Sequence, residues 1–187
     1  MAIVERYVSR RFLGVRHHMT MLVLLTGLPG TGKSTTADAI SRSLGASVLS
    51  VDALDAALST AGVSNEDGKV GYEVMKALAR NELEACRSVV IDAVNPFRFV
   101  RHAYFDLARE THANVSVIVT LCSDPEVHRR RVALRHENGE KSIDWAGVER
   151  QIGYYEQFED ECLVLDAVDP ADENSLSAVE YVLARAN

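Results

Sequence analysis

A glycine-rich run that contains a lysine, GLPGTGKS at residues 27–34, directly follows the apolar residues 21–26. The run fits the pattern G-x-x-x-x-G-K-[ST], in which backbone N–H groups and the start of the next helix surround phosphate oxygens. In this pattern Lys33 reaches the β- and γ-phosphates, and Ser34 can ligate Mg²⁺. The alternative is a glycine-rich turn with a capping lysine, but the position between an apolar strand and a helix favours a phosphate site. The predicted nucleotide-binding residues are Gly27, Leu28, Pro29, Gly30, Thr31, Gly32, Lys33 and Ser34.

Short apolar runs alternate with helix-like stretches after residue 20, a pattern typical of α/β proteins with a parallel sheet. The pattern predicts one doubly wound α/β domain over residues 21–187, preceded by a basic N-terminal extension at 1–20. Strands are predicted at 21–26, 47–51, 88–91, 115–122 and 162–165, and helices at 33–44, 53–60, 71–86, 98–110, after Asp124-Pro125, from about 144 and at 175–186.

The charge of the chain argues against polyanionic partners. It has 20 Lys and Arg against 27 Asp and Glu, a formal net charge of −7, although residues 1–20 hold four arginines and one glutamate. The part after residue 20 is therefore strongly acidic, which makes nucleic acid an unlikely ligand. The longest apolar run, residues 21–25, is too short for a membrane span or a secretory signal. We expect a cytoplasmic protein, and the sequence leaves its oligomeric state open.

Two carboxylates are predicted at the carboxyl ends of neighbouring strands, where open α/β sheets bind ligands. Asp52 follows the second predicted strand, and Asp92, with Asn95 close behind, follows the third. Asp52 suits the general base of a hydroxyl kinase, and Asp92 suits Mg²⁺ or an acceptor. For both, the alternative is a carboxylate that only caps a helix or a loop. Ala93 stands where a hydrolysing enzyme usually has a glutamate, and no N-K-x-D guanine motif occurs, so transfer from ATP is favoured.

Arginines on the predicted helix after Asp124 can supply positive charge to a transferring phosphoryl group. Arg131 and Arg135 lie four residues apart and so share one face, in a segment whose apolar stripe is thin. The alternative is a solvated charged face, which is the usual role of such a run.

Five segments together carry a family resemblance. They are the glycine-rich run with Thr35, the segment ending at Asp52, VVIDAVNP at 89–96, CSDPEVHRRRVALR at 122–135 and DWAGVERQ at 144–151. They resemble the small bacterial P-loop kinases often labelled AAA-family ATPases, which are similar to phage polynucleotide kinase, zeta toxins, gluconate kinase and chloramphenicol phosphotransferase. The resemblance implies a three-layer α/β/α P-loop NTPase fold with a five-stranded parallel sheet in the order 2-3-1-4-5. It also implies an acceptor pocket over residues 52–104 and a small helical lid around 128–142.

The resemblance assigns roles by matching position. It implies that Lys33, Asp52 and Arg131 are catalytic, with Asp52 as general base. It places Thr35 on the α-phosphate, Arg135 on ATP, and Ser34 and Asp52 at Mg²⁺. It places Arg98 or Arg101 at the acceptor. Together with Asp52, and with Asp92 and Asn95 from their position after the third strand, these are the predicted acceptor-side residues.

We therefore expect an ATP- and Mg²⁺-dependent kinase that phosphorylates a hydroxyl of a small metabolite. Two alternatives stay open: an ATP-hydrolysing switch that contacts a protein partner through residues 1–20, and a 5′-hydroxyl polynucleotide or tRNA kinase. Four aromatic residues of the acceptor region can stack on a base or sugar, or can belong to the core. They are Tyr72, Phe97, Phe99 and Tyr104.

Overall fold

The computed structural model describes residues 19–65, 68–137 and 143–186. Within these ranges a five-stranded parallel sheet runs in the order β2-β3-β1-β4-β5, which confirms the predicted order and class. Its strands are β1 (Met21–Thr26), β2 (Ser47–Ser50), β3 (Val89–Asp92), β4 (Asn114–Leu121) and β5 (Leu163–Asp166). Residues 1–18 of the predicted extension and 138–142 of the predicted lid lie outside the described residues.

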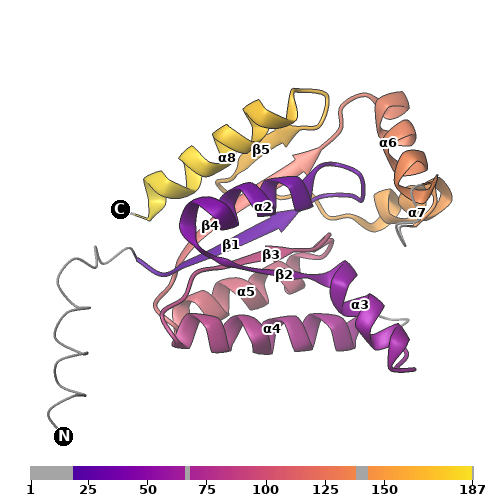
Figure 1. Cartoon of the computed structure of the whole chain (residues 1–187). Helices are drawn as coiled ribbons and strands as arrows, with labels where there is room; N and C mark the ends of the chain where they lie inside the picture. The colour runs from indigo at the N-terminus through magenta and orange to yellow at the C-terminus, as the bar shows by residue number, and fades with distance from the viewer. Residues whose placement is uncertain (1–18, 66–67, 138–142, 187) are drawn as a thin grey trace, which may run out of the picture.

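Helices cover both faces of the sheet (Figure 1). On one face lie α2 (Lys33–Leu44) and α8 (Ala171–Arg185), and on the other α4 (Lys69–Glu84) and α5 (Arg98–Glu110). Three further helices lie towards the carboxyl ends of the strands: α3 (Val51–Thr60), α6 (Pro125–Glu137) and α7 (Trp145–Tyr154). In the described part of the chain, no helix has the length and apolar character that a membrane span requires.

Strand β1 is buried along its whole length because it contributes to both cores. Leu22 and Leu24 pack with residues of α4 and α5, whereas Met21, Val23 and Leu25 pack with residues of α2 and α8. This alternation is what a central strand covered on both faces requires, and it explains the unbroken apolar run in the sequence.

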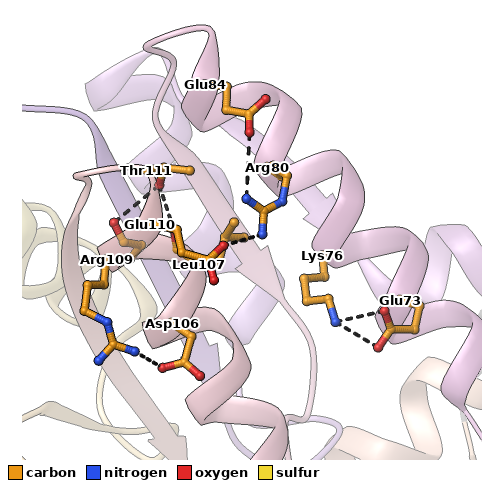
Figure 2. Close-up of polar contacts among 10 residues, drawn as sticks. Glu73, Lys76, Arg80, Glu84, Asp106, Leu107, Arg109, Glu110 and Thr111 are labelled. Carbon is orange, nitrogen blue, oxygen red and sulfur yellow. Dashed lines mark hydrogen bonds and ion pairs between the residues drawn. The ribbon is translucent and has the colours of Figure 1, made fainter.

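The two helices on the second face are joined at one end by an ion pair. Arg80 Nη2 of α4 lies 2.6 Å from Glu110 Oε2 of α5, and Arg80 also lies within 3.7 Å of Glu84 on its own helix (Figure 2). These side chains are exposed, so the pair contributes only about 0–1 kcal/mol to stability.

Arg101 is a buried structural residue. The residue is 2% exposed, and its guanidinium donates hydrogen bonds to the carbonyls of Asn95, Pro96, Glu156 and Gln157. It thereby ties the loop after β3 to the segment after α7. By contrast, Arg98 is exposed and pairs with Glu159 at 2.8 Å.

We predict that Arg101→Leu destabilises the protein, because it leaves several carbonyls without a donor. The expected loss in the free energy of unfolding is about 3 kcal/mol. Arg98→Leu, one turn earlier and exposed, is the matched control and should change stability by less than about 1 kcal/mol. Urea denaturation of both variants measures the difference, and equal stabilities would contradict the structural role of Arg101.

Candidate active site

The glycine-rich loop closes tightly against the end of β4. Gly27 has φ 144°, and a Cβ added there would lie 2.1 Å from the Thr120 carbonyl oxygen, so only glycine fits. Thr31 Oγ1 donates to Leu28 O at 2.7 Å and lies 2.6 Å from Thr120 Oγ1. Gly32 has φ 96°, precedes α2 and has no atom within 4 Å of its added Cβ, so the helix start is open to a ligand. The sequence therefore forms a loop whose backbone can approach phosphate.

Lys33 folds back over this loop. Its Nζ donates to Gly27 O at 2.8 Å and to Leu28 O at 2.9 Å, and the side chain is 8% exposed. Burial lowers the pKa of Lys33 to about 8, while Asp92 and Asp52 oppose that shift. The ammonium group is thus held at the loop by carbonyls that phosphate oxygens can replace.

Ser34 and Asp92 lie together at the carboxyl end of β3. Asp92 is 6% exposed, and its burial raises its pKa, although a hydrogen bond from Ser34 and the charge of Lys33 oppose the rise. A hydroxyl beside a carboxylate suits Mg²⁺, which prefers oxygen ligands and keeps several waters or phosphate oxygens. No cluster of three or more His, Cys, Asp or Glu occurs in the described ranges, so phosphate and water would have to complete the coordination.

Asp52 does not end a strand, which corrects the predicted boundary. Strand β2 stops at Ser50, and Asp52 is the second residue of α3. The helix begins there because the Ser50 side chain accepts a hydrogen bond from Ala53 N and serves as N-cap. Asp52 is therefore not the cap. Its side chain is 66% exposed and lies 3.5 Å from Arg135 Nη2.

These groups surround a cavity of about 530 Å³, which we call the phosphate cavity. The loop residues Gly30, Gly32, Lys33, Ser34 and Thr35 form one wall. Other lining residues are Asp52, Asp92, Ala93, Val94, Arg131 and Arg135.

Helix α6 turns one polar face towards the phosphate cavity. Arg131 Nη1 donates to the carbonyl of Ala167 at 2.7 Å, and Arg135 faces Asp52. Arg129 points elsewhere, since its guanidinium lies 5.1 Å from the centroid of the Trp145 ring and 3.7 Å from Glu126. In α6 the cavity is lined by Leu134 and by the two arginines that share a helix face.

His128 lies on the same face of α6 and was not among the predicted site residues. It is 4% exposed, and its Nε2 lies 2.7 Å from the carbonyl oxygen of Pro29. An added Cβ at Gly30 would lie 3.0 Å from Val132 and 3.5 Å from His128, so α6 packs directly on the loop. Its spacing from Arg131 and Arg135, three and seven residues, is the signal that places it on their face.

Three predicted acceptor-side residues do not line the phosphate cavity. Asn95 is fully buried, and its Nδ2 donates to Leu25 O at 2.7 Å. Arg101 binds backbone carbonyls, and Arg98 pairs with Glu159. Both arginines line a separate cavity of about 160 Å³ beside residues 157–160. The structure thus favours a structural role for Asn95 and Arg101.

A glycine-rich loop that joins β1 to α2, in a parallel sheet of order 2-3-1-4-5, defines a P-loop NTPase fold of the kinase type. The chain belongs to the AAA domain family, whose model matches residues 22–158. None of the curated proteins matches the sequence.

Several solved structures share this fold. Chaetomium thermophilum Kti12, in complex with ADP-AlF3, is 18% identical with a TM-score of 0.71, covering 89% of this chain and 99% of that one. Mycobacterium tuberculosis APS kinase CysC, in complex with AMPPNP and APS, is 21% identical with a TM-score of 0.65, covering 88% and 98%. A gluconokinase from Sinorhizobium meliloti 1021 is 21% identical with a TM-score of 0.63, covering 91% and 94%. At these identities the likeness establishes the fold.

We predict that nucleotide binding takes up a proton through Lys33. Above pH 8 the amine of the free protein is mostly neutral, because its pKa is lowered to about 8. Phosphates favour the charged form, so binding raises that pKa and affinity weakens as the pH rises above 8. Titration calorimetry with ATP in buffers of different ionisation enthalpy should show uptake at about pH 9 and none from Lys33 at about pH 6. Lys33→Arg, which stays charged, should abolish the uptake; unchanged uptake would assign it to another group.

We predict that His128 positions the loop for nucleotide. His128→Ala removes the hydrogen bond to Pro29 O and should weaken ADP binding by about fivefold to tenfold. Amide hydrogen exchange of residues 27–34 should accelerate in this variant, and His128→Gln should restore part of the affinity. Exposed His102→Ala on α5 is the control and should bind ADP like the wild type. Equal affinities in all variants would remove His128 from the site.

Proposed function

We propose that this protein is an ATP-dependent kinase that transfers the γ-phosphoryl group to a hydroxyl of a small molecule. The observation that carries the proposal is the distribution of charge around the phosphate cavity. Of the two carboxylates that line it among the described residues, Asp92 is buried against Ser34, whereas Asp52 is exposed. Asp52 is therefore the lining carboxylate that an incoming hydroxyl can reach from solvent.

The proposed chemistry is an in-line displacement. The acceptor oxygen forms a bond to the γ-phosphorus as the bond to the β,γ-bridging oxygen breaks, and ADP leaves with that electron pair. Asp52 takes the proton of the hydroxyl. Lys33, Arg131 and Arg135 offset the negative charge of the phosphates, and Arg135 would exchange its contact with Asp52 for phosphate oxygens. Thr35, which lines the cavity at the start of α2, would contact the α-phosphate.

Ser34 and Asp92 would hold Mg²⁺, directly or through water, and Asp52, which lines the same cavity, would contact its hydration shell. When bound, the ion supplies positive charge to the phosphate oxygens.

Two further observations support transfer rather than hydrolysis. Ala93 and Val94 line the cavity after Asp92, where neither side chain can polarise a water molecule. The solved neighbours include a gluconokinase and an APS kinase, which are named as kinases of small molecules.

The test follows the label of γ-labelled ATP in three reactions: protein alone, with pooled small metabolites, and with 5′-hydroxyl oligonucleotides. We expect label in a new small organic product. Asp52→Asn should lower kcat by about 100-fold or more with little change in ATP affinity, because it removes a general base. Asp38→Asn, an exposed carboxylate on α2, is the matched control.

Each alternative has its own outcome. Label released only as phosphate, at one rate in all three reactions, would replace the kinase with an ATP-hydrolysing switch. Label on the oligonucleotide, with binding that weakens steeply in salt, would instead identify a polynucleotide or tRNA kinase. Full activity of Asp52→Asn would exclude Asp52 as the base.

A further inference from the structure

A second cavity, of about 210 Å³, lies between the N-terminal halves of α4 and α5, and we call it the ring cavity. Its lining is mainly aromatic and aliphatic, with Tyr72 from α4 and Val100 and Tyr104 from α5. The opposite halves of the same helices are joined by Arg80 and Glu110 (Figure 2). The two helices are therefore tied at one end and leave a space at the other.

Tyr104 lines this cavity and carries a buried hydroxyl that no other described residue uses. The residue is 2% exposed, and its hydroxyl has no hydrogen-bond partner among the described residues. A buried hydroxyl without a hydrogen-bond partner lowers stability by about 1–3 kcal/mol, and native proteins rarely contain one. Burial raises the pKa of Tyr104, and Tyr72 and Glu73, which both line the cavity, raise it further.

Aromatic rings form a stack at the edge of the ring cavity. The Phe97 and Phe99 rings lie 5.4 Å apart with planes 13° apart, and the Phe97 and Tyr154 rings lie 5.5 Å apart at 22°. Phe99 is nevertheless 71% exposed. A solvent-exposed ring at the end of a stack leaves one flat face available to another planar ring.

The size of the cavity limits its occupant. An apolar cavity of about 150 Å³ admits benzene, whereas sites for complete drug-sized ligands begin at about 300 Å³. The ring cavity, at about 210 Å³, therefore fits one ring system and not a whole ligand. The rest of the molecule must extend outside it.

The ring cavity and the phosphate cavity share one loop. Val94 lines the phosphate cavity and Phe97 lines the ring cavity. Residues three apart lie at most about 11 Å from each other along the chain. The distance between these two lining positions is therefore within the length of one small molecule.

We propose that the ring cavity binds the planar ring of the phosphoryl acceptor, so that the substrate class is an alcohol carrying an aromatic or heteroaromatic ring. This inference rests on the proposed kinase. The ring stacks against the aromatic side chains, a polar atom of the ring bonds to the Tyr104 hydroxyl, and the alcohol reaches Asp52. Its oxygen then bonds to the γ-phosphorus, ADP leaves with the bridging oxygen, and the proton passes to Asp52. A polyhydroxylated chain would place hydroxyl groups against the aromatic and aliphatic part of the lining, although Lys69, Glu73 and Lys76 add charged groups on the α4 side.

Binding is tested first, without ATP, using adenosine and tyrosol as ring alcohols and gluconate as a ring-free alcohol. Calorimetry should detect at least one ring alcohol and no gluconate. Tyr104→Phe should weaken that binding by at least about fivefold and leave the melting temperature unchanged or higher, because the hydroxyl has no partner to lose. Ala103→Leu should fill the cavity and abolish binding, whereas Ala184→Leu, an exposed position on α8, should not. ADP affinity should stay the same in all three variants.

The outcomes separate this inference from the proposed function. Failure of both ring alcohols to bind, or equal binding by Ala103→Leu, overturns the ring site. Label transferred from ATP to gluconate and to neither ring alcohol leaves the kinase standing and also overturns the inference. Ring binding that Ala103→Leu abolishes, with no label in any product, supports the ring site and rejects the kinase. Transfer to adenosine alone or to tyrosol alone identifies which type of ring alcohol is accepted.

Discussion

The contact between the glycine-rich loop and the end of β4 is the constraint on which the rest of the site depends. The loop approaches Thr120 so closely that position 27 cannot carry a side chain, and the Thr31 and Thr120 hydroxyls lie 2.6 Å apart. The sheet therefore sets the loop conformation before any nucleotide arrives. The same closure buries Lys33 beside two loop carbonyls, so the lowered pKa of this amine is a direct consequence of the loop geometry.

The loop in turn determines which residues α6 needs on the face that packs against it. A helix that packs on another element normally needs an apolar stripe, but α6 contacts loop backbone, where a hydrogen-bonding side chain serves as well as an apolar one. His128 and Val132 make that contact and are its buried residues. Because these two residues are enough for the packing contact, the neighbouring positions can carry Arg131 and Arg135, which line the phosphate cavity. The thin apolar stripe seen in the sequence has this physical origin.

The sequence predicted most of the structural features that depend on a local pattern of residues. The glycine-rich run and the apolar strands identify the loop and the sheet, and the resemblance supplied the strand order. Asp52 was misplaced by one element because Ser50 can end a strand or cap a helix, and only the structure shows the cap. The resemblance placed Arg101 at the acceptor, and its structural role was not predictable because its partners at 156 and 157 lie 55 and 56 residues away along the chain. The four aromatic residues of the acceptor region were expected either to stack on a ligand or to belong to the core. Tyr104 is buried and Phe99 is exposed, so neither alternative describes all four.

The loop between the two cavities is held on both sides, which fixes their spacing. Asn95 adopts φ 48°, a conformation that asparagine tolerates better than most residues, and its side chain donates to β1 at Leu25 O. From the other side, Arg101 donates to its carbonyl at 3.0 Å. A fixed spacing means that an acceptor bound by its ring cannot adjust the position of its hydroxyl. Since a misplacement of about 1 Å can cost about 100-fold in rate, acceptors with a shorter or longer arm would bind well and react slowly. Selection among ring alcohols would therefore act on kcat more than on affinity.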